Sequence, residues 1–232
     1  MDFEQPVGSN TTSMIQGILG SPPGPGELGV LLARAGVGKT ACLTHIALEQ
    51  LLRGLPVLHV CVDEMPEKIK VWYLELLKNM STSQSREELM KLQLRIEPLR
   101  FILAYLHHTF NPGKLEQSLA NLKDQTNFKP SMVVLDGLDF DRVSRSTIEE
   151  LRSFAQRHSV SLWMSARTHR HKSVANEHGI PYPCNEIDDV FHTIVLLEPV
   201  PSAIQVKVLK NGDQFGPEHP PLVLSSQTYL AR

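Results

Sequence analysis

The sequence has few cysteines, few aromatic side chains and no excess of charge of either sign. Its three cysteines, Cys42, Cys61 and Cys184, are an odd number and show no CxxC spacing, which argues against a disulfide framework or a zinc site. Lysine and arginine total 23 while aspartate and glutamate total 25, so the formal net charge is −2. The chain therefore lacks the global basic field that attracts nucleic acid or anionic lipid.

Long hydrophobic runs are absent as well. No uninterrupted apolar stretch approaches the roughly 18 residues that a membrane-spanning helix requires. The first residues, MDFEQPVGSNTTSM, lack the basic start and apolar core that are typical of a secretion signal. Together with the cysteine usage, these absences predict a cytoplasmic protein with no membrane partner. The 232 residues, 41% of them hydrophobic, are enough to bury the core of one α/β domain.

Proline and glycine are concentrated near the start of the chain. The segment GSPPGPGE, residues 20–27, is too broken by these residue types to form a helix or a strand. We expect residues 1–26 to form an N-terminal arm and a Pro/Gly linker, and residues 27–232 to form one domain. No internal repeat or low-complexity segment divides that domain further.

Short apolar runs alternate with segments of helical spacing through the domain. Strands are predicted at residues 28–33, 56–62, 100–106, 131–137, 160–166, 191–199, 203–210 and 221–226. Helices are predicted from Lys39 to the stop signal at Gly54 and at residues 66–80, 85–96, 111–125 and 147–158. This alternation predicts an α/β fold with a mainly parallel sheet, helices on both faces and a mixed or antiparallel C-terminal edge. Residues 167–186 are predicted to form a polar loop.

A glycine-rich loop, ARAGVGKT, joins the first predicted strand to the first predicted helix. This context is typical of a phosphate-binding loop, in which main-chain N–H groups surround the β-phosphate at the positive end of a helix. The Lys39 ammonium would neutralise the β- and γ-oxygens, and the Thr40 hydroxyl would ligate Mg²⁺. A chance Gly-Lys-Thr at a helix start is the alternative. The predicted nucleotide-binding residues are Arg34, Ala35, Gly36, Val37, Gly38, Lys39, Thr40 and Ala41.

Asp136 ends a short apolar strand about a hundred residues after the loop. Walker B aspartates occupy such a position and hold the Mg²⁺ shell, so we predict this role for Asp136. The alternative is an aspartate that caps a turn or a helix. Asp139 and Asp141, which follow in the sequence, are interpreted as turn and cap residues.

Residues 26–64, GELGVLLARAGVGKTACLTHIALEQLLRGLPVLHVCVDE, resemble the RecA-like ATPases of the group that contains DnaB-type replicative helicases and KaiC. Ala33, which stands where such loops usually begin with glycine, is similar to the DnaB form. Alanine is tolerated there if the backbone is extended. The resemblance continues more weakly through VVLDGLDF, SLWMSARTHR, EIDDVFHTIVLLEP and VKVLKNG, and leaves residues 81–130 unmatched.

The resemblance implies roles for three further residues. Glu64 follows the second predicted strand and would polarise the attacking water, although Asp63 also qualifies and the pair could instead stabilise the positive end of the next helix. Ser165 stands where this group has a γ-phosphate sensor. Lys210 aligns with a Lys-x-Arg element that reaches the neighbouring subunit's ATP, but Gly212 replaces the arginine. Because losing an arginine finger costs on the order of 10³ to 10⁵ in rate, this departure predicts slow hydrolysis or an arginine supplied from elsewhere.

The one concentrated basic stretch is RTHRHK, which begins at Arg167. It could contact phosphate, a nucleic-acid backbone or a neighbouring subunit's nucleotide, or it could be a solvated surface loop. Its His-x-His pair, even with His178, lacks the Cys or carboxylate spacing of a metal cluster.

The sequence therefore predicts a RecA-like P-loop protein that binds ATP and Mg²⁺, a slow ATPase that acts as an oligomeric machine or a nucleotide switch. Three alternatives remain: a nucleotide-gated interaction module without significant turnover, a DnaB-like nucleic-acid translocase, and a P-loop kinase. Gly212 favours the switch over the motor, and the lack of an Arg-rich lid speaks against the kinase. The expected partners are ATP, further copies of the chain and an unidentified protein. Nucleic acid is supported by the basic stretch alone.

Overall fold

The computed structural model describes residues 22–81, 84–169, 174–216 and 220–231, so most of the predicted N-terminal arm lies outside the described residues. The described strands form one nine-stranded sheet in the order β3-β2-β4-β5-β1-β6-β7-β8, with β9 also paired to β7. The strands are β1 (Leu28–Ala33), β2 (Val57–Val62), β3 (Arg100–Tyr105), β4 (Met132–Asp136), β5 (Ser161–Arg167), β6 (Thr193–Val200), β7 (Ala203–Asn211), β8 (Gln214–Phe215) and β9 (Leu222–Ser225).

The six strands from β3 to β6 are mutually parallel, whereas β7 is antiparallel to β6, β8 and β9. The prediction of a mainly parallel sheet with an antiparallel C-terminal edge is therefore confirmed. The two-residue strand β8 was not predicted, because it is too short to show an apolar pattern.

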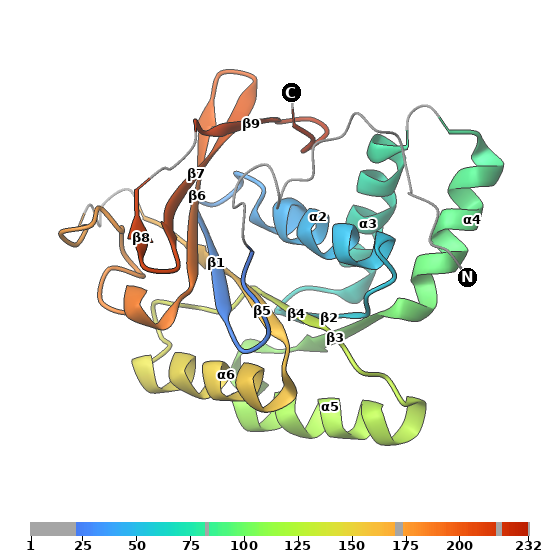
Figure 1. Ribbon diagram of the computed structural model, residues 1–232, viewed down its shortest axis with the longest axis horizontal. Coiled ribbons are helices and arrows are strands. Elements are labelled where there is room, and N and C mark those ends of the chain that lie inside the picture. Colours follow the sequence, from blue (N-terminus) through green and yellow to red (C-terminus); the bar gives the residue numbers. More distant parts are fainter. Residues whose placement is uncertain (1–21, 82–83, 170–173, 217–219, 232) are drawn as a thin grey trace.

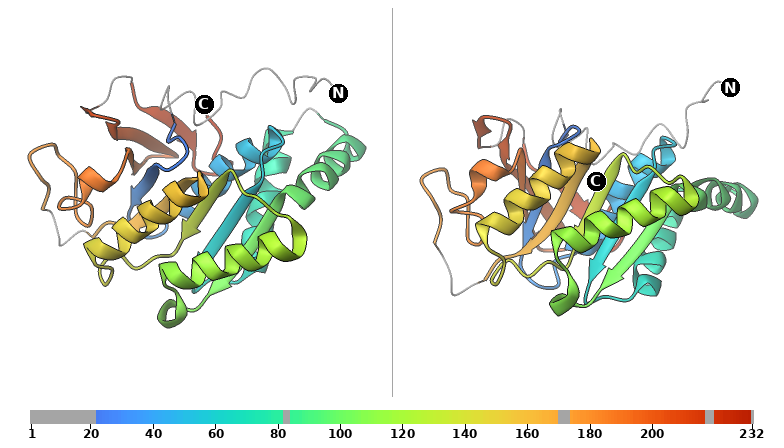
Figure 2. Two further views of the ribbon diagram at one scale, coloured as in Figure 1. Left: turned by 60° about the horizontal axis from the view of Figure 1, so that its bottom comes forward. Right: turned by 90° about the horizontal axis from the view of Figure 1, so that it is seen from below.

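Helices cover both faces of the sheet (Figure 1, Figure 2). Helices α2, α3 and α4 contribute to one apolar layer, and α5 and α6 contribute to the other. Their bounds are α2 (Lys39–Leu52), α3 (Pro66–Met80), α4 (Arg86–Ile96), α5 (Pro112–Thr126) and α6 (Arg145–His158). The 3-10 helices among the described residues are η1 (Glu97–Leu99), η2 (His107–Thr109) and η3 (Asp188–Val190). Within the described part of the chain, no helix is both long and apolar enough to cross a membrane.

Local sequence signals explain where the helices begin. Ser85 and Glu88 form a reciprocal capping box at the start of α4, and Asn111 caps α5 through the main-chain N–H of Lys114. Helix α6 begins two residues before the predicted start at residue 147, because the Ser144 side chain accepts a hydrogen bond from the Thr147 N–H. The prediction missed this N-cap, which lies outside the apolar pattern.

The segment predicted as a polar loop at residues 167–186 is partly a core element. Residues 170–173 lie outside the described residues, but Ile180 and Cys184 are completely buried in the layer formed with α5 and α6. Ala175 also forms an isolated β-bridge with Pro181. The described part of this segment beyond β5 is a loop, as predicted, but it is not polar throughout. Isolated apolar residues without periodicity gave no signal of their burial.

Parallel strands place their carboxyl ends along one edge of the sheet. The ends of β1, β2, β4 and β5 lie there, and the residues that follow these strands include the glycine-rich loop and the acidic pair at residues 63–64. In open α/β sheets, ligands bind at this edge. The fold thus brings the predicted site residues of four separate segments to a common edge.

The centre of the sheet depends on close contact between β1 and β5. Gly29 is the register partner of Trp163, which is completely buried. A Cβ atom at Gly29 would lie 2.7, 2.8 and 2.9 Å from three ring atoms of Trp163. Glycine is required here because the indole ring occupies the space that any other side chain would fill.

We predict that Gly29→Ala lowers the free energy of unfolding by about 1–3 kcal/mol, since the added methyl group overpacks the indole. Urea denaturation followed by circular dichroism measures the difference. Gly24→Ala is the matched control, because its Cβ would meet no atom nearer than 3.4 Å, from the side chain of Glu27. That control should change stability by less than about 0.5 kcal/mol. Equal stability of the two variants would contradict the packing argument.

Candidate functional site

The glycine-rich loop connects β1 to α2 with two residues in the left-handed region. Gly36 has φ 78° and Gly38 has φ 109°, a conformation that favours glycine. Ala33 is the last residue of β1 and is extended, so glycine is not needed at that position. Gly38 is the N-cap of α2, and no described side chain caps the first amides of this helix. These amides and the positive end of the helix are therefore available to an anion.

The Lys39 side chain folds back over the loop. Its Nζ donates to the carbonyl oxygens of Ala33 at 3.1 Å and Arg34 at 3.2 Å. Burial lowers the pKa of Lys39, the negative charge of Asp136 opposes that shift, and the positive charge of Arg167 adds to it. The ammonium is thus held over the loop with only main-chain carbonyls as described hydrogen-bond partners.

Asp136 joins three elements at the carboxyl edge of the sheet. Its side chain is nearly buried at the end of β4. Its Oδ2 accepts a hydrogen bond from Thr40 Oγ1 at 2.6 Å, and its Oδ1 accepts one from Ser165 Oγ at 2.5 Å. Thr40 lies in the first turn of α2 and Ser165 lies in β5. The two residues predicted to hold Mg²⁺ are therefore in direct contact although 96 positions separate them.

Ser165 was predicted as a sensor, and its described contacts are local. Besides donating to Asp136, the Ser165 Oγ accepts a hydrogen bond from the Gly137 N–H at 3.3 Å. The hydroxyl thus fixes the orientation of the Asp136 carboxylate and of the turn that follows it. Its role as a γ-phosphate sensor stays a prediction.

The acidic pair after β2 faces two directions. Asp63 has φ 56°, and its Oδ1 accepts a hydrogen bond from the His107 N–H at 2.5 Å, so this carboxylate binds the η2 turn. Glu64 forms an ion pair with Lys68 and accepts a hydrogen bond from the Met65 N–H at 3.2 Å. The predicted alternative, in which the acidic pair stabilises the positive end of the next helix, thus holds in part, because Glu64 contacts the first turn of α3. Its side chain is still 34% exposed and lines the cavity beside the loop.

A cavity of about 450 Å³ lies between the loop, β4 and the acidic pair. Carboxylates, an ammonium, a guanidinium and two hydroxyls surround it. The polar residues among those that line it are Lys39, Thr40, Asp63, Glu64, Asp136, Asp139, Asp141, Ser165 and Arg167. The last of these, at the end of β5, was predicted as a phosphate-contacting candidate and does reach this cavity.

Asp141 was interpreted as a turn or cap residue, and this interpretation missed its contacts. Its Oδ2 lies 2.7 Å from His169 Nε2, and its Oδ1 accepts a hydrogen bond from the Tyr182 hydroxyl at 2.5 Å. Asp139, by contrast, accepts a hydrogen bond from the Asp141 N–H within the turn, as predicted. Asp141 thus links the segment after β4 to the two ends of the segment after β5, and no local pattern could have indicated this.

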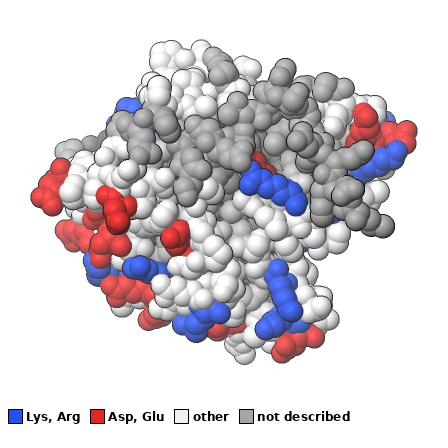
Figure 3. All heavy atoms as spheres, in the orientation of Figure 1, with Lys and Arg blue, Asp and Glu red and all other residues white. Residues whose placement is uncertain are grey.

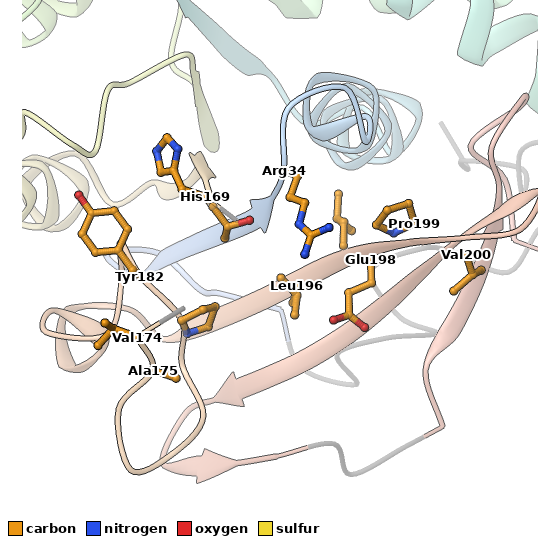
Figure 4. A pocket seen from close by; sticks show the side chains of 12 residues that line it. Arg34, His169, Val174, Ala175, Tyr182, Leu196, Glu198, Pro199 and Val200 are labelled. Atoms are coloured by element: carbon orange, nitrogen blue, oxygen red, sulfur yellow. The ribbon is translucent and has the colours of Figure 1, made fainter. Parts of the chain in front are cut away.

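A second cavity of about 450 Å³ lies on the other side of the loop, over β6 (Figure 4). Arg34, a predicted nucleotide-binding residue, lines this cavity, and Figure 4 shows its guanidinium directed toward Leu196 and Glu198. The Arg34 side chain therefore does not line the first cavity. In this arrangement Arg34 contributes its main chain to the loop and its side chain to a separate hollow.

Lys210 lies far from both cavities of the loop. It pairs with Ile194 near the amino end of β6. The loop follows the carboxyl end of the parallel neighbour β1, so Lys210 and the loop lie at opposite ends of the strands. Its Nζ donates to the Asp188 carbonyl at 2.7 Å and the side chain is nearly buried. Burial lowers the pKa of Lys210, while Asp188 and Asp189 oppose that shift. Within one chain Lys210 therefore cannot reach the loop, and its action on a neighbouring subunit stays a prediction.

The described residues on the face shown in Figure 3 do not form one basic area. On the face in Figure 3, the blue lysine and arginine side chains are scattered among red acidic ones, outside the grey atoms. Of the basic stretch, Arg167 lines the first cavity and His169 contacts Asp141. Arg170, His171 and Lys172 lie outside the described residues.

Neither a protein-family model nor a curated protein matches this sequence. The groups that could take part in chemistry lie at the start of α2 and at the end of β4. Main-chain amides at a helix start and the Lys39 ammonium can bind an anion. The hydroxyl and carboxylate oxygens of Thr40 and Asp136 are the ligand type that Mg²⁺ prefers.

We predict that Ser165→Ala lowers the free energy of unfolding by about 1.5–3 kcal/mol, because a nearly buried carboxylate loses one of its two hydroxyl donors. Urea denaturation at neutral pH measures the loss. Ser153→Ala is the control: its hydroxyl donates to the Glu149 carbonyl on the exposed side of α6. It should cost less than about 0.5 kcal/mol. If both variants are equally stable, the Ser165 contact does not constrain Asp136.

Proposed function

We propose that this chain is a RecA-like P-loop protein that binds ATP together with Mg²⁺ and hydrolyses it slowly. The observation that carries the proposal is the 2.6 Å hydrogen bond between Thr40 and Asp136. A phosphate-binding loop requires a hydroxyl at its end and a carboxylate at a nearby strand end, both facing one metal position. In this chain the two groups already touch, beside a loop with two glycines of positive φ.

The residues fit a triphosphate ligand. The amides at residues 36–40 would bind the β-phosphate, and the Lys39 ammonium, now bonded to two carbonyls, would turn to the β- and γ-oxygens. Bound Mg²⁺ would neutralise charge on these oxygens. Arg167 adds a second cation to the cavity. The chain thus supplies two positive side chains and a helix terminus against the negative charge of the phosphates.

Two features support slow turnover. Glu64 lines the cavity and is the candidate that polarises the attacking water, but its pairing with Lys68 competes with that task. Gly212 stands where the resemblance expects an arginine that reaches the neighbouring subunit's ATP. Without that arginine or a substitute for it, hydrolysis slows by orders of magnitude.

A nucleotide switch without significant turnover is the second candidate, and the contacts of Asp141 favour it. Asp141 lines the phosphate cavity and also contacts His169 and Tyr182. A ligand that displaces the Asp141 carboxylate would change the segment that carries Tyr182, which is the kind of order change that nucleotide switches use. Turnover measured together with solution mass, with and without single-stranded nucleic acid, separates the switch from an oligomeric motor.

We predict that Lys39→Ala weakens ATP binding by at least about a hundredfold, because the phosphates lose their main charge-assisted partner. Isothermal titration calorimetry with Mg-ATP measures the affinity. Lys123→Ala, on the exposed side of α5, removes one positive charge far from the loop and should bind like the unchanged protein. Equal affinity of the Lys39 variant and the unchanged protein would refute the loop assignment.

We predict that Glu64→Gln keeps ATP affinity but lowers the rate of phosphate release at least about a hundredfold, since glutamine cannot accept the proton of the attacking water. A phosphate-release assay at saturating Mg-ATP measures the rate. Glu67→Gln, which is exposed in the first turn of α3, is the control and should hydrolyse normally. Full turnover in the Glu64 variant would remove this residue from the mechanism. Binding without any turnover in the unchanged protein would favour the switch.

A further inference from the structure

The C-terminal residues fold back toward the glycine-rich loop. After β9, the Tyr229 N–H donates to the Ser225 carbonyl at 2.9 Å, and the Ser225 N–H donates to the Leu230 carbonyl at 2.9 Å. An isolated β-bridge between Leu224 and Ala231 follows. We call residues 225–231 the C-terminal turn. Its internal hydrogen bonds give this end of the chain a defined shape.

The ring of Tyr229 packs against the loop at Gly38. A Cβ atom at Gly38 would lie 2.3 Å from Tyr229 Cε1 and 2.9 Å from its Cζ, so the ring occupies the space beside this glycine. The same ring meets Trp72 of α3 edge-to-face, with centroids 5.6 Å apart and an interplanar angle of 87°. Tyr229 thus lies between the phosphate loop and α3.

The main chain of the C-terminal turn is bonded to both neighbouring helices. His45 Nδ1 of α2 lies 3.0 Å from the Tyr229 carbonyl oxygen, and Asn79 Nδ2 of α3 donates to the Thr228 carbonyl at 3.3 Å. Tyr229 itself has φ 57°, which a residue with a large side chain rarely adopts. These contacts hold an unfavourable backbone conformation, and strain of this kind persists only where the surroundings impose it.

Gly38 is the residue at which the loop becomes the helix. Its φ of 109° is readily adopted only by glycine. Because glycine has no Cβ atom, the loop can adopt many conformations at this position unless a neighbouring group restricts it. A ring pressed against Gly38 excludes part of these conformations. A binding loop that is ordered before its ligand arrives loses less conformational entropy on binding, which raises affinity.

From this geometry we infer that Tyr229 is a positioning residue for the phosphate loop, and that the C-terminal turn regulates nucleotide affinity through it. The inference rests on the proposed nucleotide binding. By linkage the effect is reciprocal: a bound nucleotide stabilises the C-terminal turn, and any partner that pulls the turn away weakens nucleotide binding.

The first test compares Mg-ATP affinity among variants by calorimetry. Tyr229→Ala should bind about three- to tenfold more weakly, the range expected when an aromatic contact is lost. Tyr229→Phe keeps the ring and should stay within about twofold of the unchanged protein, which a role of the hydroxyl would not permit. Phe215→Ala is the matched control. It removes a partly exposed aromatic ring at the opposite edge of the sheet and should leave the affinity unchanged.

The second test follows the unchanged protein, so its main result does not depend on the folding of a Tyr229 variant. Mg-ATP should slow amide hydrogen exchange in residues 225–231, and it should not do so in Lys39→Ala. If the unchanged protein binds ATP but exchange in this segment is unaffected, or if Tyr229→Ala binds as tightly as the unchanged protein, this inference alone is wrong. If the unchanged protein binds no ATP, the proposed function fails and the inference fails with it.

Discussion

One buried carboxylate organises the candidate site. Asp136 lies almost out of solvent at the end of β4, where an unpaired charge would be costly, and two hydroxyl groups donate to it. The Thr40 donor belongs to α2 and the Ser165 donor to β5, so this single group fixes the relative position of a helix and two strands. The glycine-rich loop, the cavity beside it and the metal ligands of our proposal all meet at this contact.

The loops around Asp136 also make contacts with one another and with the C-terminal turn. Asp63 binds the η2 turn, Asp141 binds His169 and Tyr182, and Tyr229 packs on Gly38 from the C-terminal turn. Polar contacts between loops and the packing of the Tyr229 ring thus support the carboxyl edge of the sheet, whereas apolar packing holds the two faces. This separation is compatible with our proposal, in which the loops respond to nucleotide while the sheet keeps its packing.

Local pattern predicted the fold well because burial on both faces gives parallel strands near-continuous apolar runs. The strands that carry the loop and Asp136 were therefore found with their ends correct to within one residue. The predictions failed where a residue's role depends on distant partners. The burial of Ile180 and Cys184, the cross-links of Asp141 and the direction of the Arg34 side chain have no local signal.

The sequence alone determined the α/β class, the loop between the first strand and α2, and the aspartate at a strand end, because each follows from spacing and residue type within a few positions. Only the tertiary structure decided that Thr40 and Asp136 meet, that Lys210 lies at the opposite edge, and that Tyr229 returns to the loop. The physical reason is that strand order and register, which bring distant segments together, are set by long-range pairing and packing that no short stretch of sequence encodes.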